Sequence, residues 1–363
     1  LWASHMLPIY RQLDGEDTKS KNEEVFNQCA RILKYGRNLL IFGEGFTDDV
    51  FIRRLKPVKK GAVRIGFLTL EKINWKKNIY IAAVGCNYSN PNQIGSDLLV
   101  STSDKICLND YQEAYLVNPN KVINEISKQI EQLMREQITH VEDKEMAPFH
   151  ENVMRLTRKG MNSKCSDTKI PLKQRWLYSK GLAHWFNGNV SPENESLMTL
   201  KKDLENYFSL LKKMKLEEHH LYDFKTKNGS KWKEVLFLIF TFPFALLGII
   251  HCGIPYIIVK RFVEKSFKRK VFWGSVKLLL GMLIVGIFNL PVIFLFVKFI
   301  YPSYLLAFVY FVFIGVLGVT AYHWFKNLRA FKVKGVMKKI DLSKIWKKRT
   351  DLVQRIKELI PVA

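Results

Sequence analysis

The sequence predicts an α/β domain followed by a helical extension and a C-terminal α-helical membrane region. Three observations support this prediction for the chain of 363 residues. Helix-periodic and strand-like apolar segments alternate over residues 1–140, as in α/β domains. Residues 141–234 are polar with mostly helical spacing, and three long stretches without charge follow. The 48% hydrophobic content excludes a disordered chain.

The expected elements of the α/β domain follow from the spacing of apolar residues. Residues 22–35 have the spacing of an amphipathic helix, and Gly36 is placed to end it. Residues 39–42 and 79–84 are short apolar runs typical of buried strands. The remaining elements are two helices, 62–70 and 119–134, and two weaker strands, 98–100 and 106–108.

The net charge of +24 indicates an anionic partner, and its distribution favours a membrane. Residues 235–363 hold 20 of the 57 Lys and Arg residues but only four of the 33 Asp and Glu residues. Cations and apolar runs are therefore interleaved, as they are near anionic lipid. Nucleic acid is a weaker alternative, because the chain has no aromatic–basic motif of a nucleic-acid-binding fold.

The membrane region is expected over residues 235–325. Residues 235–259, 278–297 and 299–325 contain no Asp, Glu, Lys or Arg, and each is long enough to cross a bilayer. We expect a transmembrane hairpin formed by 274–297 and 302–325. The basic loop after the first stretch and the basic tail after the third predict that both face the cytoplasm.

The first stretch, 235–259, is expected to be a re-entrant or in-plane element rather than a span. Lys231 and Lys233 precede it and a basic loop follows it, so both of its ends favour the cytoplasmic side. It also contains residues that interrupt a straight helix, namely Pro243, Gly248, Gly253 and Pro255.

Residues 326–363 are expected to form a basic amphipathic cytoplasmic tail. Apolar residues recur at three- and four-residue steps over 342–360 among Lys and Arg. Such a helix either packs on the soluble domain or lies among lipid headgroups, and the neighbouring spans favour the headgroup layer. Five cysteines without a CxxC pair indicate neither a disulfide framework nor a zinc site, and favour a reducing cytosolic face.

One cluster of residues has the composition of a phosphate site. Glu44 lies between Gly43 and Gly45 after an apolar run, and Lys59, Lys60 and Arg64 follow near the start of the expected helix 62–70. Cations and a helix N-terminus both favour bound phosphate. Taken alone, a glycine-flanked Glu is more often a turn residue. A dinucleotide loop is disfavoured, because the third glycine is absent.

The order of four motifs resembles the glycerophospholipid acyltransferase family, whose members acylate glycerol 3-phosphate or lysophosphatidic acid. Residues 7–11 (LPIYR) resemble the family's second block, and 42–45 (FGEG) with 59–62 (KKGA) resemble the third. Residues 81–85 (IAAVG) resemble the fourth. The likeness covers residues 6–138. Gly43 and Ala83 stand where the family usually has Pro, and no Arg closely follows Gly45.

The resemblance implies a membrane-bound acyltransferase of phospholipid biosynthesis, with its catalytic domain on the cytoplasmic face. Arg11, Lys59, Lys60 and Arg64 would bind the phosphate of the acceptor, and Glu44 beside Gly45 would accept a hydrogen bond from a glycerol hydroxyl. The acyl donor would be acyl-CoA or acyl carrier protein, with no metal or further cofactor.

The catalytic pair of that family, a His followed four residues later by an Asp, is not found in this chain. We expect it upstream of Leu1, so that no catalytic residue is assigned here. The alternative is a non-catalytic membrane-surface protein that binds anionic lipid. No role in nucleic-acid binding is expected.

Overall fold

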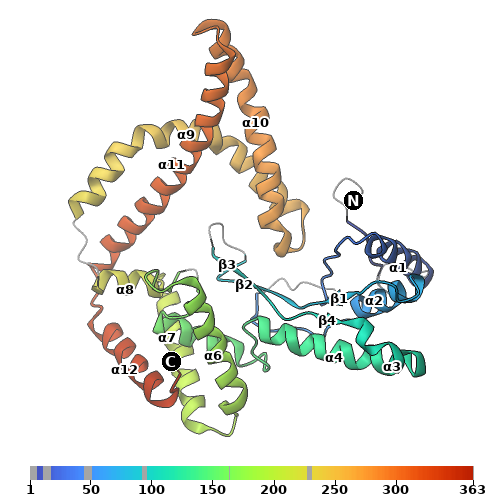
Figure 1. Cartoon of the computed structure of the whole chain (residues 1–363). Helices are drawn as coiled ribbons and strands as arrows, with labels where there is room; N and C mark the ends of the chain where they lie inside the picture. The colour runs from blue at the N-terminus through green and yellow to red at the C-terminus, as the bar shows by residue number, and fades with distance from the viewer. Residues whose placement is uncertain are drawn as a thin grey trace.

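The computed structural model of the chain describes residues 6–10, 18–44, 51–91, 96–162, 164–226 and 231–362. Figure 1 shows three parts: an N-terminal part of helices and short strands, a bundle of helices, and three long helices that project from them. Helix is the main secondary structure of the described residues, and strands are few.

The helices expected in the N-terminal part are confirmed. They are α1 (Thr18–Lys34), α2 (Gly61–Lys72) and α4 (Pro119–Gln137). The structure adds two short helices that were not expected, the 3-10 helix η3 (Leu108–Tyr111) and α3 (Gln112–Val117). Gly36 follows α1 with φ of +74°, a conformation that favours glycine. Asn118 caps α4 by accepting a hydrogen bond from the Lys121 N–H group. These ends were readable from the sequence because local contacts form them.

The strands form two short antiparallel pairs. β1 (Tyr80–Ile81) pairs with β4 (Ile106–Cys107), and β2 (Val84–Tyr88) pairs with β3 (Leu98–Thr102). Strand is therefore present in each of the regions 79–84, 98–100 and 106–108. Within the described residues, however, each sheet has only two strands, so the larger sheet of an α/β domain is not confirmed.

The prediction of a buried strand over residues 39–42 is wrong. This segment has no regular secondary structure, and the side chains of Leu40 and Phe42 are 74% and 83% exposed. Only Leu39 and Ile41 pack against a small core cluster, formed by Val25, Cys29 and Ile65. An apolar run becomes a buried strand only when neighbouring strands supply its hydrogen bonds and cover both faces.

The helical extension forms a bundle with its own core. Its helices are α5 (Ala147–Thr157), α6 (Leu172–Asn189), α7 (Glu195–Lys213) and α8 (Glu218–Thr226). The C-terminal helix α12 (Ser343–Leu359) joins them. Its Leu352 and Ile356 are 1% and 0% exposed in that core. The prediction that this apolar face lies among lipid headgroups is therefore wrong, because the bundle covers it.

A buried ion pair holds α12 in the bundle. Nε of Arg349 lies 2.6 Å from Oε1 of Glu218, and these residues are 6% and 0% exposed. Glu218 also accepts a hydrogen bond from the Tyr207 hydroxyl, and Nη2 of Arg349 donates to the Leu156 carbonyl at 3.1 Å. Burial and the Glu218 carboxylate raise the pKa of Tyr207, which keeps the phenol protonated as a donor.

Three helices are long and apolar enough to cross a membrane: α9 (Lys231–Ser266), α10 (Trp273–Phe299) and α11 (Tyr304–Met337). A 3-10 turn, η4 (Lys270–Phe272), precedes α10. These helices support the expected membrane region. Residues 326–337 of the expected tail continue α11, so the tail begins as part of a long helix.

The expected interruption of the first apolar stretch is not found. Helix α9 continues through Pro243 and Pro255, and Figure 1 shows it as a curved helix. A proline removes one backbone hydrogen bond and bends a helix without necessarily ending it. The re-entrant or in-plane course of 235–259 stays a prediction, because helix continuity does not decide on which side of a membrane each end lies.

Replacing Arg349 by Leu should lower the free energy of unfolding by about 3–5 kcal/mol, because it leaves the Glu218 carboxylate buried without its cation. Chemical denaturation in detergent micelles, followed by tryptophan fluorescence, measures this loss. The control is Arg355→Leu, which breaks the more exposed pair with Asp203 and should cost about 1 kcal/mol or less. Equal losses in both variants would contradict the prediction.

His150 predicts a pH dependence of stability. Its ring is fully buried with Nε2 3.1 Å from the Ser179 carbonyl, and burial together with the Arg53 charge lowers its pKa to about 4. The folded state thus disfavours protonation, so this contribution is complete above pH 6.5 and is lost as the pH falls towards 4. The loss is about 3 kcal/mol. Denaturation curves between pH 7 and 4 should show a weaker dependence for His150→Gln.

Candidate functional site

Glu44 lies in a turn that is fastened to the approach of α2. Its Oε1 atom accepts a hydrogen bond from the Lys56 N–H group at 2.8 Å. The Gly43 carbonyl accepts from the Lys59 N–H group at 2.8 Å. Two backbone segments, 43–44 and 56–59, are therefore tied to each other. Glu44 has the turn role that its flanking glycines indicate, and this turn places it beside the cationic segment.

Helix α4 supports the same segment from the other side. Oε2 of Glu131 accepts a hydrogen bond from the Val58 N–H group at 3.0 Å, and Oε1 pairs with Nη2 of Arg135 at 2.9 Å. The Val58 hydrogen bond and the Arg135 charge lower the pKa of Glu131 despite its partial burial. A Cβ atom at Gly43 would lie 3.1 Å from Val58, so the two segments approach closely. Sequence analysis did not identify Glu131.

The start of α2 presents cations to solvent. Lys60 is the N-cap residue of α2, and its side chain makes no capping hydrogen bond to the first turn. Lys59, Lys60 and Arg64 are exposed. Uncapped N–H groups and the helix dipole both favour a bound anion, and the three cations add to this attraction. This end of α2 can therefore hold a phosphate group.

The structure brings together four of the six residues that the sequence predicts for substrate binding: Glu44, Lys59, Lys60 and Arg64. Arg11 and Gly45 lie outside the described residues. The four residues lie on an open surface, and the two cavities identified in the described part of the chain lie elsewhere. Neither of those two cavities is formed by the predicted site residues.

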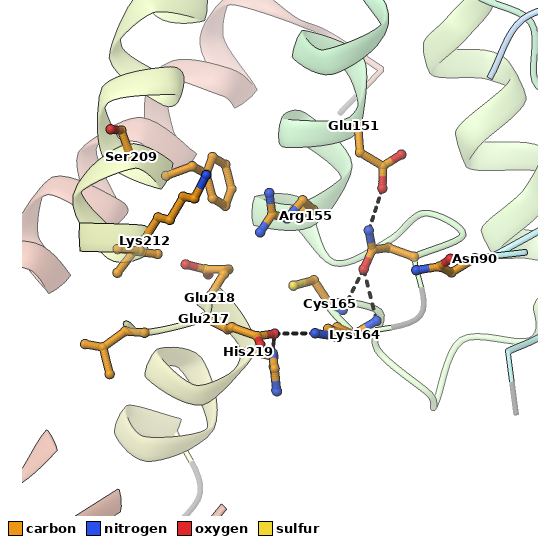
Figure 2. A pocket seen from close by; sticks show the side chains of 14 residues that line it. Asn90, Glu151, Arg155, Lys164, Cys165, Ser209, Lys212, Glu217, Glu218 and His219 are labelled. Carbon is orange, nitrogen blue, oxygen red and sulfur yellow. Dashed lines mark hydrogen bonds and ion pairs between the residues drawn. The ribbon is translucent and has the colours of Figure 1, made fainter. Parts of the chain in front are cut away.

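The larger cavity, of about 700 Å³, lies in the helical extension (Figure 2). Its charged groups are largely engaged with one another. Lys164 pairs with Glu217 at 2.6 Å, and the guanidinium of Arg155 lies 3.9 Å from the centre of the Phe208 ring. Because cations and acids are mixed along this wall, the cavity has no clear preference for an anionic ligand. No sequence motif indicated it, since its residues come from distant segments.

Two groups at this cavity could have suggested catalysis, and their environments argue against it. Burial and the neighbouring His220 lower the pKa of His219 to about 4. Burial raises the pKa of the Cys165 thiol, which keeps it in the unreactive protonated form. In the described part of the chain, no cluster of three or more His, Cys, Asp and Glu side chains is arranged to hold a metal ion.

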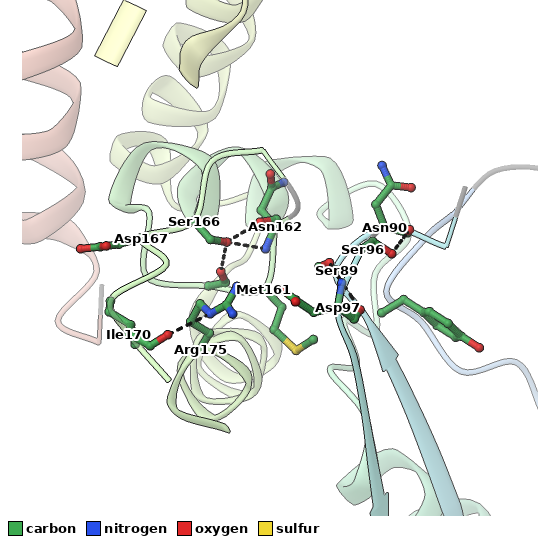
Figure 3. Close-up of polar contacts among 12 residues, drawn as sticks. Ser89, Asn90, Ser96, Asp97, Met161, Asn162, Ser166, Asp167, Ile170 and Arg175 are labelled. Atoms are coloured by element: carbon green, nitrogen blue, oxygen red, sulfur yellow. Dashed lines mark hydrogen bonds and ion pairs between the residues drawn. The ribbon is translucent and has the colours of Figure 1, made fainter. Parts of the chain in front are cut away.

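The loop beside the cavity joins the β2–β3 hairpin to the helical extension (Figure 3). Arg175 of α6 donates to Asp97 at 3.0 Å and to the Ile170 carbonyl at 3.1 Å. Ser89 also holds Asp97 in place, because its hydroxyl oxygen accepts a hydrogen bond from the Asp97 N–H group at 2.8 Å. These contacts tie the β2–β3 hairpin to α6 of the helical extension.

Comparisons of the chain with protein-family models, with curated proteins and with solved structures found no match.

Replacing Glu44 by Ala should loosen the approach to α2, because the Lys56 N–H group loses its acceptor. Hydrogen exchange should become about tenfold faster at the amides of residues 56–59 and stay unchanged in α7. Glu44→Gln is the matched control, since its amide oxygen can still accept the bond. Faster exchange in both variants, or in neither, would contradict this role of the carboxylate.

Proposed function

We propose that the chain carries the acceptor-binding site and the membrane region of an acyltransferase that acts on glycerol 3-phosphate or lysophosphatidic acid. The observation that carries the proposal is the uncapped start of α2. There, Lys59, Lys60 and Arg64 are exposed in or next to the first turn, and Lys60 makes no side-chain cap. The carboxylate of Glu44 is hydrogen-bonded to the Lys56 N–H group in the segment that leads to this turn. The order of motifs that resembles glycerophospholipid acyltransferases supports the same function.

The residues divide the proposed task between charge and hydrogen bonding. Arg64 offers a planar fork to phosphate oxygens, whereas Lys59 and Lys60 act as mobile point charges. Glu44 has one oxygen committed to the Lys56 N–H group. Its second oxygen, Oε2, would accept a hydrogen bond from a glycerol hydroxyl and orient it. By resemblance, Arg11 would add a further phosphate contact.

The proposed reaction moves an acyl group from a thioester of coenzyme A or acyl carrier protein. The glycerol oxygen attacks the thioester carbonyl carbon, the C–S bond breaks and the thiol leaves with a proton. The general base is the His of the His–Asp pair that this sequence does not contain. The present residues would thus position the acceptor, and transfer would need a general base that they do not supply.

The three apolar helices support the proposal that the acceptor is a lipid in a bilayer. Lysophosphatidic acid keeps its acyl chain in the membrane while its phosphate stays at the surface. A cationic site joined to long apolar helices suits such a molecule. We propose a cytoplasmic location for this site, because the basic residues that flank the apolar helices favour that side.

A second candidate function is the non-catalytic binding of anionic lipid. It is favoured by the exposed cations at the α9–α10 junction: Lys260, Arg261, Lys265, Lys268 and Lys270. Attraction of this kind is spread over a surface and weakens with salt. Binding of this kind would not require the cations at the start of α2. Replacing those cations therefore separates the two functions experimentally.

The double variant Lys60→Ala/Arg64→Ala should bind lysophosphatidic acid about 10- to 100-fold more weakly, because charge-assisted bonds to phosphate are lost. Calorimetry with the protein in phosphatidylcholine nanodiscs measures this change. Lys76→Ala, another exposed cation of the same part, should bind as the wild type does. Unchanged binding by the double variant would refute the acceptor site.

The same preparations separate the second candidate. For an acceptor site, soluble glycerol 3-phosphate should compete with lysophosphatidic acid, and replacement of Lys260, Arg261 and Lys265 by Gln should leave the competition unchanged. For surface binding of anionic lipid, those three replacements should weaken binding to phosphatidylglycerol vesicles, and glycerol 3-phosphate should not compete.

A further inference from the structure

The two ends of the membrane region are attached to the same bundle. Helix α8 precedes α9, and α12 follows α11. The buried pair of Glu218 and Arg349 joins α8 to α12. A second ion pair, between Glu234 and Lys334, joins the first turn of α9 to the last turns of α11. The start of α9 and the end of α11 therefore lie on the same side of the apolar region.

This attachment limits how many of the helices can cross a bilayer. Each crossing moves the chain to the other side, so a chain that starts and finishes on one side crosses an even number of times. All three of α9, α10 and α11 are long and apolar enough to cross, yet three crossings would separate α8 from α12. At most two of them can cross.

Charge selects α10 and α11 as the crossing pair. Their connecting turn, 300–303, has no charged residue, and Lys298 is the one cation near it. The last turns of α9 and the loop that leads to α10 together hold six Lys and Arg residues within 260–270. Cations of this density remain on the cytoplasmic side. In Figure 1, α10 and α11 spread from their turn like an inverted V, and the curved α9 contacts both of them.

Three polar side chains meet where α9 passes the hairpin. Nδ1 of His251 lies 2.6 Å from Oδ1 of Asn289 on α10, and Nε2 lies 3.1 Å from the hydroxyl of Tyr310 on α11. His251 and Asn289 are buried. We refer to these three residues as the clasp. Polar groups in apolar surroundings are costly unless paired, so each helix is held by the partners on the other two.

The clasp also repairs the bend of α9. In a regular helix, the His251 carbonyl would accept the N–H group of residue 255, but Pro255 has none. Nδ2 of Asn289 donates to this carbonyl at 3.0 Å and to the Val285 carbonyl at 2.8 Å. Both N–H groups of the Asn289 amide therefore donate to main-chain carbonyls, and its Oδ1 accepts a hydrogen bond from the Nδ1–H group of His251. The unprotonated Nε2 of His251 then accepts a hydrogen bond from the Tyr310 hydroxyl. Every polar side chain of the clasp therefore has a partner.

Close backbone packing fixes the crossing point beside the clasp. A Cβ atom at Gly248 would lie 2.2 Å from the carbonyl oxygen of Leu317 on α11. A Cβ atom at Gly318 would lie 2.9 Å from Sγ of Cys252 on α9. Only glycine allows this approach, which brings His251 within reach of Tyr310.

We propose that α9 enters and leaves the membrane on the same side as a bent re-entrant helix, and that the clasp of His251, Asn289 and Tyr310 holds its bend between the crossing helices α10 and α11. The polar triad is thus a device for membrane topology. The clasp replaces the backbone hydrogen bond lost at Pro255. It also binds α9 to the hairpin of α10 and α11, although α9 itself does not cross the membrane.

Cysteine labelling tests the topology. Trp232→Cys, Ser266→Cys and Pro302→Cys are introduced singly after the five native cysteines are replaced by Ala, and sealed vesicles of each orientation are treated with a membrane-impermeant maleimide. Residues 232 and 266 should react from one face and residue 302 from the other. Labelling of 232 and 266 from opposite faces would overturn the proposal, as would labelling of all three from one face.

Hydrogen exchange in nanodiscs tests the clasp. Asn289→Leu should accelerate exchange of the α9 amides between 246 and 256 at least tenfold, and Tyr310→Phe should do so to a smaller extent. Thr320→Val is the control, because the Thr320 hydroxyl bonds only within its own helix, to the Val316 carbonyl. Unchanged protection of α7 shows that each variant is folded. Equal exchange in Asn289→Leu and Thr320→Val would overturn the role of the clasp.

Discussion

The buried ion pair between Arg349 and Glu218 is the interaction on which the arrangement of the chain depends. It joins residues separated by 131 positions, with the three long apolar helices between them. Burial of two charges is tolerated here because Tyr207 and the Leu156 carbonyl complete their hydrogen bonds. The pair therefore requires the chain to return to the bundle that it left, and this return constrains the course of the apolar helices.

Buried polar side chains are paired across helices both in the bundle and between the apolar helices. The bundle buries a charged pair, whereas α9, α10 and α11 bury a neutral triad. In both places, polar side chains are hydrogen-bonded to groups on other helices, so these contacts specify which helices are neighbours. Apolar packing alone is less specific, because lipid tails can cover an apolar helix face as well as another helix can.

At the approach to α2, the residue that fastens a turn is also the one proposed to bind the acceptor. Glu44 fastens its turn to Lys56 through one oxygen. That fastening, with the support of Glu131, keeps the cationic approach to α2 in a fixed place. The proposed acceptor site is open to solvent, which suits a ligand whose acyl chain remains in a membrane. The cavity of the helical extension has mixed charge and is a poorer match for a phosphate.

The sequence by itself determined those features that depend on neighbouring residues. The cap at Asn118, the end of α1 at Gly36 and the apolar length of α9, α10 and α11 are set within a few turns of chain, so spacing and composition predict them. The cations around Lys60 were likewise visible, because they are close in sequence.

Only the tertiary structure decided which surfaces are covered and which distant groups meet. The spacing of α12 predicts an apolar face but cannot say whether lipid or protein covers it, and the bundle core covers it. The run 39–42 is apolar, yet the described chain gives it no neighbouring strand. The contacts of Glu131 with Val58, Asn289 with His251 and Arg349 with Glu218 join remote segments. Their partners are fixed by packing in three dimensions, which no local pattern of residues records.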